Sequence, residues 1–505
     1  MNIFRTDQIR LLDAKTIELE GIHSSALMDR AAEALFAGIR NLIDQSSESV
    51  LVLAGPGNNG GDALAVARLL IQNGYQVTTA VCSYGKKLSE DAALQLERLQ
   101  HLQNCRLLFP KTAEELTSLP PFDHLLDGLF GSGLNRPLEG AFAATVQWMN
   151  RQSAQIISID LPSGLFGEDN RTNHPEAIVM ANQTFGLQFP RLAFFLAENE
   201  AYLGNWKLVD IGIRKDAIKS LKTPFSMTSL QEARLILKDR ARFSHKGTFG
   251  KSLLITGSKG MTGAAILAGH GALRSGTGLL TFRIPADSLP IVQTAVPEAT
   301  AQTWDNAFWD RTCSVDGWSA IGVGPGLGRP VAGPMALECL LKQQPQRLVI
   351  DADALNLLSE NPSLLVLIPA GTILTPHPGE FDRLAATSFK TGYDRLEAAI
   401  QFATAHQVHL ILKGAYTACI SPDGTCRFNS TGNPGMSTGG SGDVLTGIVV
   451  SLLAQGYSQQ EACVLGTFLH GLSADLAMGH QSQESLLAGD IADNLGAAFN
   501  ALRQA

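Results

Sequence analysis

A glycine-rich stretch near the end of the chain is the first candidate for chemistry. Residues 433–447 read NPGMSTGGSGDVLTG, so five of these fifteen residues are glycine, and Asp443 precedes an apolar run. Glycines let consecutive backbone N–H groups turn towards one anion, and the helix expected from about Val444 adds favourable partial charge at its N-terminus. A carboxylate there can take a proton from a hydroxyl that attacks a phosphoryl group. The alternative role for Asp443 is the N-cap of the helix, and both roles can coexist.

Further polar residues follow apolar, strand-like runs in the same half of the chain. They are Asp351, Asp353 and Asn356 in VIDADALN, His377 and Glu380 in TPHPGEF, Lys413 in ILKGAYT, and the GPGLG turn around Gly326. Because ligands of open parallel sheets bind beyond the carboxyl ends of the strands, we expect these groups to line one crevice. Taken singly, His377 would more often be a structural turn histidine. The segment GTFGKS is not a Walker loop, because His245 stands where the first glycine is needed.

The first half has a glycine-rich turn of its own, GPGNNG, over residues 55–60. It satisfies GxGxxG, but the next strand-like run ends in AVCSYGKK, without the acidic residue that binds ribose, so an ordinary NAD site is disfavoured. Backbone N–H groups at a helix N-terminus can still receive phosphate, and Asn58, Asn59 and Asp62 add unusual polarity. We expect a functional loop here in preference to a merely structural turn.

Two more apolar runs of the first half end in aspartate. In FDHLLDGLFG the apolar run ends at Asp127. In QIISIDLPSG it ends at Asp160, shortly before Ser163. Either aspartate could be a helix cap or a turn former. Together with the glycine-rich turn, however, they place three polar strand ends at one edge of a sheet. Asparagine, aspartate and serine oxygens would suit a hard monovalent or divalent cation.

Two series of alternating strand-like and helical runs must position these residues. A helical arm is expected over residues 6–43, with Thr6 as its cap. The first series then runs from SVLVLAG to QIISIDLPSG and the second from KSLLITGSKG to VHLILKGAYTACI, which predicts βαβ units and mostly parallel sheets. Between them, around residues 214–245, charge rises and a proline interrupts. We therefore expect two tandem α/β domains, over residues 1–222 and 223–505.

Composition excludes several classes of protein. With 505 residues, 45% hydrophobic and 17% charged, the chain is typical of a soluble enzyme of two or three domains. A net charge of -8 argues against nonspecific nucleic-acid binding. The seven cysteines form no CxxC pair, so a reducing cytoplasm is expected in place of a disulfide framework or a zinc site. No apolar run approaches the roughly 20 residues of a membrane span.

Four motifs of the first half, GPGNNGGDAL, DGLFGSGL, DLPSG and ALMDRAAEAL, resemble the YjeF N-terminal domain, the NAD(P)HX epimerase family, over about residues 1–220. The resemblance implies a Rossmann-like three-layer α/β/α domain that interconverts the R and S epimers of hydrated NADH and NADPH with bound potassium. Matched by motif, the potassium ligands would be Asn59, Asp127 and Ser163. The substrate contacts would be Asn58, Asn59, Gly60, Gly61, Asp62, Gly131, Ser132, Gly133, Leu134, Asn135, Arg136, Pro137 and Asp160. Asp160 is the candidate acid/base, because epimerisation at a carbon bearing a hydroxyl needs proton transfer.

Six motifs of the second half, HKGTFG, GPGLG, DADALN, TPHPGEF, LKGAYT and NPGMSTGGSGDVL, resemble the ADP/ATP-dependent NAD(P)HX dehydratase branch of the ribokinase-like superfamily, over about residues 225–505. The resemblance implies phosphorylation of the hydroxyl on the hydrated ring, then loss of phosphate to give NADH or NADPH. Asp443 would activate that hydroxyl. Contacts to the hydrated nucleotide would be Ala264, Gly326, His377 and Asp443. Contacts to ADP or ATP would be Lys413, Gly414, Ala415, Tyr416, Thr417, Gly439, Gly440, Ser441 and Gly442, the last four forming an anion hole.

The leading hypothesis is thus a bifunctional repair enzyme acting on NADHX and NADPHX, with Mg²⁺ expected on the nucleotide but without a clear protein ligand set. ADP is the expected nucleotide, because the family's bacterial members generally use it. We expect a cytoplasmic homo-oligomer with no nucleic-acid or membrane partner. Two alternatives stay open: the second domain could be a true kinase of a small alcohol such as a vitamin precursor, and the first a non-catalytic nucleotide-binding module. The sequence does not fix the oligomeric state or any channel between the sites.

Overall fold

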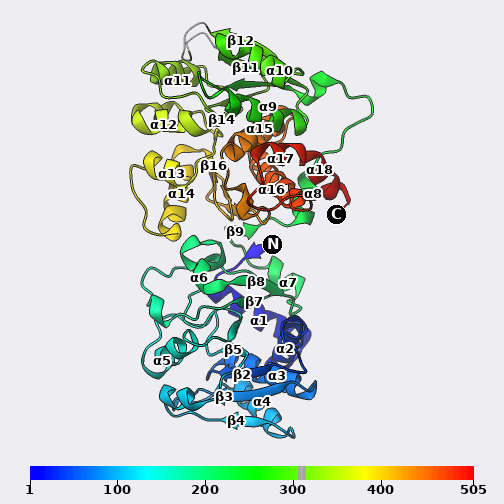
Figure 1. The fold of residues 1–505 in the computed structure, drawn as a ribbon, viewed down its shortest axis with the longest axis vertical. Coiled ribbons are helices and arrows are strands. Elements are labelled where there is room, and N and C mark those ends of the chain that lie inside the picture. Colours follow the sequence, from blue (N-terminus) through cyan, green and yellow to red (C-terminus); the bar gives the residue numbers. More distant parts are fainter. Residues whose placement is uncertain (305–308, 310–313, 505) are drawn as a thin grey trace. The chain divides into compact units, whose positions relative to one another are not determined.

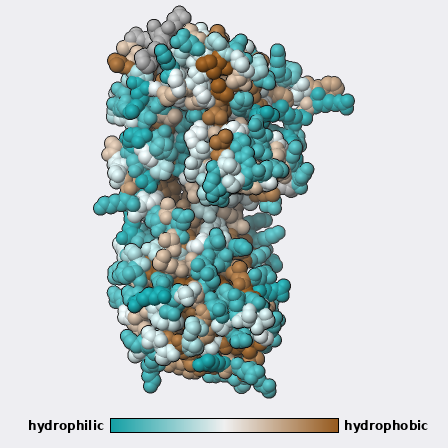
Figure 2. Space-filling model, in the orientation of Figure 1, coloured by the Kyte–Doolittle hydropathy of each residue, from teal (hydrophilic) through white to brown (hydrophobic). Residues whose placement is uncertain are grey.

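The structure is a computed structural model that describes residues 1–304, 309 and 314–504. The chain divides into two compact units, one over Asn2–Thr223 and one over Pro224–Ala505 together with Met1 (Figure 1). Hydrophilic side chains cover most of the face shown in Figure 2, with hydrophobic ones in small groups between them. Among the described residues, no helix combines the length and apolar character that crossing a membrane requires.

The first unit is built on a sheet of seven strands in the order β4-β3-β2-β5-β6-β7-β8. Every neighbouring pair in this sheet is parallel, as the alternating pattern predicts. The strand order reverses direction between β2 and β5, which is the place where open α/β sheets bind their ligands. The strands are β2 (Ser49–Ala54), β3 (Gln76–Val81), β4 (Arg106–Leu108), β5 (His124–Gly128), β6 (Gln155–Ile159), β7 (Gln183–Leu187) and β8 (Asn205–Val209).

Helices cover both faces of this sheet, so the unit has the three layers expected of it. One buried core joins the sheet to α2 and α3, and another joins its opposite face to α5. After the short strand β1 (Asn2–Ile3), the helices are α1 (Thr6–Glu20), α2 (Ser24–Ile39), α3 (Asn58–Gln72), α4 (Glu90–Gln100), α5 (Gly140–Met149), α6 (Glu200–Leu203) and α7 (Lys215–Lys219).

The helical arm expected over residues 6–43 is two helices. Gly21, with φ of 62°, ends α1 in a left-handed conformation that glycine adopts at little cost, and α2 begins at Ser24. The prediction that Thr6 caps the arm is also wrong. Arg5 is the N-cap residue of α1, and the backbone N–H of Thr6 donates to Glu168 Oε1 at 2.8 Å.

The second unit contains a larger sheet, with the order β9-β18-β17-β16-β15-β14-β13-β10-β11-β12. Its strands pair in parallel except β17, which is antiparallel to both β16 and β18. The order reverses between β10 and β13. The strands are β9 (Phe225–Met227), β10 (Lys251–Ile255), β11 (Leu279–Pro285), β12 (Thr300–Trp304), β13 (Ala320–Val323), β14 (Leu348–Ile350), β15 (Ile373–Leu374), β16 (His409–Leu412), β17 (Ala418–Ile420) and β18 (Cys426–Phe428).

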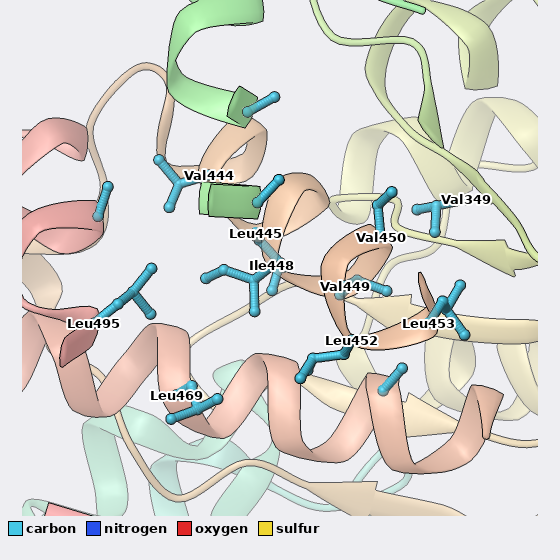
Figure 3. Packing of buried hydrophobic residues seen from close by; sticks show 14 of the residues in the cluster. Val349, Val444, Leu445, Ile448, Val449, Val450, Leu452, Leu453, Leu469 and Leu495 are labelled. Atoms are coloured by element: carbon cyan, nitrogen blue, oxygen red, sulfur yellow. The ribbon is translucent and has the colours of Figure 1, made fainter. Parts of the chain in front are cut away.

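One helix of this unit, α15, is buried almost throughout. Apolar side chains on all its sides, from Val444 to Leu453, pack against neighbouring helices and the sheet (Figure 3). A helix that is apolar all round belongs in a core. The helices are α8 (Leu230–Ile236), α9 (Thr262–Arg274), α10 (Leu289–Ala295), α11 (Gly333–Lys342), α12 (Ala352–Glu360), α13 (Pro378–Leu384), α14 (Gly392–His406), α15 (Ser441–Ala454), α16 (Gln459–Ala477), α17 (Ala488–Asp493) and α18 (Leu495–Gln504).

Two glycines allow the backbones of α9 and α15 to approach closely. A Cβ atom at Gly447 would lie 1.9 Å from the carbonyl oxygen of Ala268, and one at Gly271 would lie 2.3 Å from that of Val444. Any side chain at either position would push the helices apart. This contact fixes the start of α15, and with it Asp443, relative to α9.

Candidate functional sites

The first candidate site lies at the carboxyl ends of β2 and β5, where the strand order of the first unit reverses. The glycine-rich turn after β2 is compact, because a Cβ at Gly55 would lie 1.8 Å from Leu129 O and one at Gly60 would lie 1.9 Å from Gly55 O. The turn leads directly into α3, whose first residue is Asn58. The first N–H groups of an α-helix have no partner within the helix, so they are suited to bind an anion at this end of α3.

Asp160 occupies a strained position immediately after β6. Its φ of 64° lies in the left-handed region, which costs a non-glycine residue free energy and is enriched at functional sites. Its Oδ1 accepts from Arg191 Nη2 at 2.6 Å, and its Oδ2 accepts from the backbone N–H of Ser132 at 2.7 Å. A Cβ at Gly131 would lie 2.7 Å from Asp160 Oδ2 and 2.9 Å from Asn59 Oδ1. The three motifs that carry Asn59, Gly131 and Asp160 thus meet at one place.

Asp127 is fully buried at the end of β5 and is held by hydrogen bonds. The hydroxyl of Ser158 donates at 2.8 Å and the N–H of Ser163 at 2.8 Å. Ser163 Oγ lies 2.5 Å from Asp127 Oδ1 and 3.0 Å from the carbonyl oxygen of Phe130, although it has one proton to donate. Burial raises the pKa of Asp127 against the lowering effect of these bonds. Among the described residues, no basic side chain forms an ion pair with it.

Two further carboxyl groups interact electrostatically with Asp160. Burial raises the pKa of Asp62 well above its ordinary value, with further contributions from the charges of Asp160 and Asp13. Burial also raises the pKa of Asp13 to about 6, against the opposing charge of Arg191. Neither carboxyl forms a hydrogen bond within the part of the chain that the structure describes. The buried Nδ2 atom of Asn59 lacks a partner as well, so polar groups here are available to a ligand.

The second candidate site is centred on the first turn of α15. The helix begins at Ser441 after Gly440, which has φ of 92°, so Gly440 is the N-cap residue. The interpretation of Asp443 as the N-cap is therefore wrong, because it is the third residue of the helix. Burial raises the pKa of Asp443 to about 7; the nearby Asp351 charge adds to the rise and Lys413 opposes it. A carboxyl group with this pKa can exchange protons near neutral pH.

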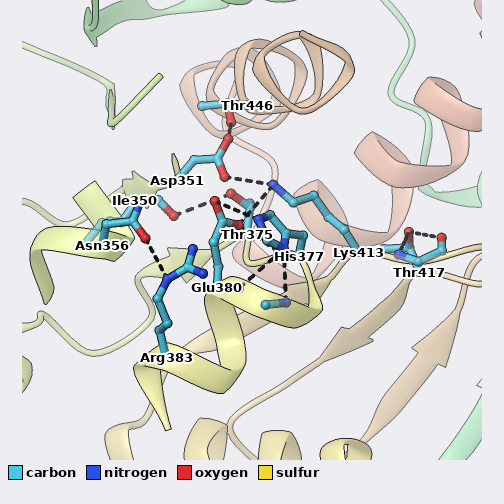
Figure 4. Close-up of polar contacts among 12 residues, drawn as sticks. Ile350, Asp351, Asn356, Thr375, His377, Glu380, Arg383, Lys413, Thr417 and Thr446 are labelled. Atoms are coloured by element: carbon cyan, nitrogen blue, oxygen red, sulfur yellow. Dashed lines mark hydrogen bonds and ion pairs between the residues drawn. The ribbon is translucent and has the colours of Figure 1, made fainter. Parts of the chain in front are cut away.

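Lys413, which follows β16, is the cation at this site (Figure 4). Its Nζ lies 3.0 Å from Asp351 Oδ1 and 3.7 Å from Glu380 Oε2. Burial acts to lower the pKa of Lys413, but the charges of Asp351 and Glu380 outweigh it and hold the pKa above its ordinary value. Thr446 Oγ1 donates to the other oxygen of Asp351 at 2.6 Å. Lys413 therefore stays protonated among several carboxylates.

His377 has a structural role at the turn before α13, as is expected of a single histidine in such a position. It is the N-cap of α13, and its Nδ1 accepts from the N–H groups of Gly379 and Glu380 at 3.1 and 3.4 Å. In return, Glu380 Oε2 accepts from the N–H of His377 at 2.8 Å. The imidazole is still half-exposed, with Nε2 lying 3.6 Å from Glu380 Oε1. His377 can therefore cap the helix with one nitrogen and meet a ligand with the other.

Some of the remaining predicted residues of the second site lie next to one another. A Cβ at Gly326, whose φ is 63°, would lie 2.9 Å from the Cβ of Ala264, at the reversal point between β10 and β13. A Cβ at Gly442 would lie 3.3 Å from Lys413 Nζ, so the glycine loop and the strand end meet. Gly414 and Ala415 are exposed beyond β16, and Thr417 Oγ1 donates back to Gly414 O at 3.1 Å.

Known families match both units. The family described as YjeF-related protein N-terminus matches residues 24–193, and the family described as NAD(P)H-hydrate dehydratase matches residues 252–496. A bifunctional NAD(P)H-hydrate repair enzyme of Moorella thermoacetica is 34% identical over 466 residues, covering 89% of this chain and 87% of that protein. This chain belongs to the family of bifunctional NAD(P)H-hydrate repair enzymes.

Other family members resemble the chain over nearly its whole length. The bifunctional NAD(P)H-hydrate repair enzyme of Coxiella burnetii is 32% identical, covering 99% of each chain, and that of Escherichia coli is 30% identical, covering 99% of this chain and 94% of that protein. Among solved structures, the ADP/ATP-dependent NAD(P)H-hydrate dehydratase of Bacillus subtilis, co-crystallised with ATP and Mg²⁺, is 32% identical. It covers 55% of this chain and 98% of its own, with a TM-score of 0.47. The two matched segments of this chain contain Asp160 and Asp443 respectively.

Part of the stretch predicted to contact the substrate is exposed. In the 131–137 stretch, Asn135 and Arg136 are exposed, whereas Leu134 packs partly against a hydrophobic core. The carbonyl oxygen of Gly133 accepts from Arg10 Nη2 of α1 at 3.1 Å. Within the described ranges, no three His, Cys, Asp or Glu side chains are arranged to hold a metal ion.

The sequence prediction missed three residues that the structure brings to the sites. Arg191 follows β7 and pairs with Asp160, Thr446 donates to Asp351, and Asp13 of α1 interacts electrostatically with Arg191 and Asp160. Arg191 could have been found as one more polar residue after an apolar run, QTFGLQFPR. Asp13 carried no such signal, because a charged residue in an amphipathic helix normally faces solvent.

Proposed function

We propose that the chain is a bifunctional NAD(P)H-hydrate repair enzyme whose two units each hold one active site. The first unit interconverts the R and S epimers of NADHX and NADPHX. The second dehydrates the S epimer to NADH or NADPH at the expense of ADP or ATP, with phosphate as the second product. The observation that carries this proposal is the agreement of whole-chain family membership with two separate carboxylate centres, around Asp160 and Asp443.

In the first unit, Asp160 acts as an acid/base at the carbon that bears the hydroxyl. The pairing with Arg191 at 2.6 Å and the N–H of Ser132 hold its carboxylate in one orientation. The NNGGD loop, over residues 58–62, and the 131–137 stretch would bind the substrate around it. Unpaired N–H groups of α3 are suited to its phosphates, and the unpartnered Nδ2 of Asn59 can donate to it.

The surroundings of Asp127 fit a potassium ion held by Asn59, Asp127 and Ser163. The buried carboxylate lacks an ion-pair partner among the described residues, and Ser163 Oγ has two oxygen neighbours but only one proton. A cation would satisfy both shortages, and all the candidate donors are hard oxygen atoms. When bound, potassium would supply positive charge that keeps Asp127 ionised and fixes the DLPSG and DGLFGSGL loops.

In the second unit, Asp443 takes the proton from the substrate hydroxyl as that hydroxyl attacks the terminal phosphoryl group. Ala264, Gly326 and His377 would bind the hydrated nicotinamide nucleotide. The stretch 413–417 and the 439–442 loop would bind ADP or ATP, whose negative charge the N-terminus of α15 and Lys413 can balance. Loss of the phosphate, together with a proton from the neighbouring ring carbon, then leaves the double bond of NADH or NADPH.

Magnesium would enter with the nucleotide. When bound, Mg²⁺ would neutralise charge on the phosphates during transfer. The carboxylates of Asp351 and Glu380 lie next to Lys413 and have the oxygen chemistry that Mg²⁺ prefers. We further propose a cytoplasmic location, where these nucleotides are made and used. Assembly into a homo-oligomer stays a prediction, which light scattering on the purified chain would check.

The proposal is tested by incubating the full chain with mixed NADHX epimers and ADP. Recovery of the absorbance of NADH from both epimers, with one phosphate released per NADH, is the expected result. A stable phosphorylated nucleotide that never becomes NADH would instead indicate a kinase. If instead only the S epimer is converted rapidly, and the R epimer disappears no faster than it does without enzyme, the first unit is not an epimerase.

A further inference from the structure

Helix α1 lies against the epimerase site, although it precedes the segment that matches the family. Its buried residues Ile9 and Leu12 belong to one hydrophobic cluster with Phe189, two residues before Arg191. Arg10 of the same helix donates to Gly133 O at 3.1 Å. Asp13 stands one turn after Ile9, on the same side of the helix. The helix therefore meets two segments that carry predicted site residues.

Asp13 lies in the electrostatic field of the catalytic carboxylate. The charged groups that act on it are Arg191, which follows β7, and Asp160, which follows β6, and it acts in turn on Asp62 of α3. Within the described chain, Asp13 forms no hydrogen bond or ion pair. Asp62 is only 8% exposed and likewise has no hydrogen-bond partner there. Asp160, in contrast, has both oxygens engaged, so the carboxyls around this site have unlike environments.

We propose that Asp13 is the second acid/base residue of the epimerase site, working as a pair with Asp160, and that α1 forms part of the wall of that site. This inference rests on the proposed epimerase function of the first unit. It adds a catalytic group from a helix outside the segment that defines the family match.

The chemistry of epimerisation gives such a pair two distinct tasks. The carbon to be inverted bears a hydroxyl and is bonded to the ring nitrogen. As the C–O bond breaks, one carboxylic acid gives its proton to the hydroxyl, which leaves as water, and the nitrogen lone pair forms a C=N⁺ bond. Water then adds to the opposite face, the C=N⁺ electrons return to nitrogen, and the other carboxylate takes the proton. Atoms and charge balance without an oxidant, and proton exchange with solvent restores the pair.

The environments of the two carboxyls suit this division. Asp160 pairs with Arg191 at 2.6 Å and accepts from the N–H of Ser132, so its carboxylate is held in one orientation. Burial raises the pKa of Asp13 to about 6, so this carboxyl retains a proton at a higher pH than an exposed aspartate does. Two carboxyls whose surroundings differ in this way are typical of acid and base partners. The cationic C=N⁺ intermediate would also be stabilised between them.

The test is Asp13→Asn in the full chain, with epimer exchange followed by chromatography in the absence of ADP and corrected for the uncatalysed rate. We expect kcat to fall by about 10²–10⁴-fold. The wild-type enzyme should lose kcat/KM as the pH rises above about 6, where Asp13 loses its proton, and the variant should not show this loss. Asp7→Asn, at an exposed position of the same helix, is the matched control and should behave as wild type.

Further variants separate a catalytic role from a structural one. Asp13→Glu keeps the acid and should recover part of the activity that Asp13→Asn loses, whereas equal losses in both, with a lowered Tm, would overturn the proposal. A wild-type rate in Asp13→Asn would overturn it as well. So would a result in which the fall in kcat/KM above about pH 6 is absent from Asp62→Asn but still present in Asp13→Asn. If Asp160→Asn retains the wild-type rate, the proposed function of the site itself fails, which the Asp13 variants alone would not indicate.

Discussion

Thr446 donates its hydroxyl to Asp351 Oδ2 at 2.6 Å, and both side chains are buried. This hydrogen bond connects α15 to the residue that follows β14. The other oxygen of Asp351 accepts from Lys413 at 3.0 Å. The position of the catalytic helix and the charge of the dehydratase site therefore depend on the same carboxylate.

Replacing this hydroxyl should weaken the second unit. Thr446→Val leaves Asp351 Oδ2 without its donor, and we expect a loss of about 1–3 kcal/mol in stability, because a buried carboxylate oxygen loses a hydrogen bond. Thermal unfolding of the full chain would measure it as a lower Tm for the second unit. Thr446→Ser keeps the hydroxyl and is the control. An unchanged Tm in Thr446→Val would show that the bond contributes little.

Dehydration should depend on the ionisation of Asp443. Its pKa is raised to about 7, so kcat/KM should increase as the pH rises through about 7 and then level off. Since Lys413 acts to lower this pKa, Lys413→Met should move the inflection to higher pH. Initial rates of NADH formation from S-NADHX at saturating ADP would give both profiles. If kcat/KM of the wild-type enzyme falls as the pH rises through about 7, another group must carry out the proton transfer.

Removing the Asp443 carboxyl should abolish dehydration yet stabilise the protein. Asp443→Asn should lower the rate by about 10²–10⁴-fold and leave epimer exchange intact. A carboxyl whose folded pKa is raised favours folding below its unfolded pKa, and this advantage is lost as the pH rises through about 7. At pH 8 the free energy of unfolding of the variant should therefore exceed that of wild type by about 1–2 kcal/mol, which thermal unfolding would show as a higher Tm. At pH 4 the two proteins should have the same Tm. If variant and wild type have the same stability at pH 8 as well as at pH 4, burial does not raise the pKa of Asp443 as described.

Asp160→Asn should give the opposite pattern of activities. The variant is expected to lose epimer exchange but to convert S-NADHX to NADH at the wild-type rate, because the two carboxylates belong to separate compact units. Separate assays with purified epimers would measure this. Loss of both activities would count against independent sites.

Potassium should matter to the first unit alone. With ionic strength held constant, replacing potassium by a large organic cation should slow epimer exchange and spare dehydration. Ser163→Ala removes one of the candidate oxygen ligands, so more potassium should be needed for half-maximal activity. Ser158→Ala, which removes another hydroxyl bonded to Asp127, tests whether loss of that bond alone has the same effect.

The sequence predicts the long, strongly patterned elements and much less of the sheet edges. The runs around β2, β3, β5 and β6 are rich in apolar and β-branched residues, and each forms the expected buried strand. The strands β4, β9 and β18 have three residues each, too few for a periodic signal. β7 contains Gly186, which interrupts its apolar pattern, and β8 is a partly exposed edge strand.

The same physical limits explain what was found and missed at the sites. Asp127 stands near the end of a recognisable strand, and Asp160 and Lys413 follow two others, so the rule for parallel sheets places all three at carboxyl ends of strands. Arg191 follows β7, and because that strand was not recognised, the arginine was not identified as a strand end. The capping role of His377 and the position of Asp443 within α15 depend on backbone geometry that the residue pattern does not encode.

The break at Gly21 separates α1 from the segment by which the family is recognised, since that segment begins at residue 24. A fragment cut at the family boundary would keep the glycine-rich turn, Asp127, Asp160 and Arg191 but lose Asp13 and Arg10. It would also expose Phe189, against which α1 packs. An assay on such a fragment would thus measure a damaged enzyme, and an absence of epimerase activity in it would be misread as evidence for a non-catalytic binding module.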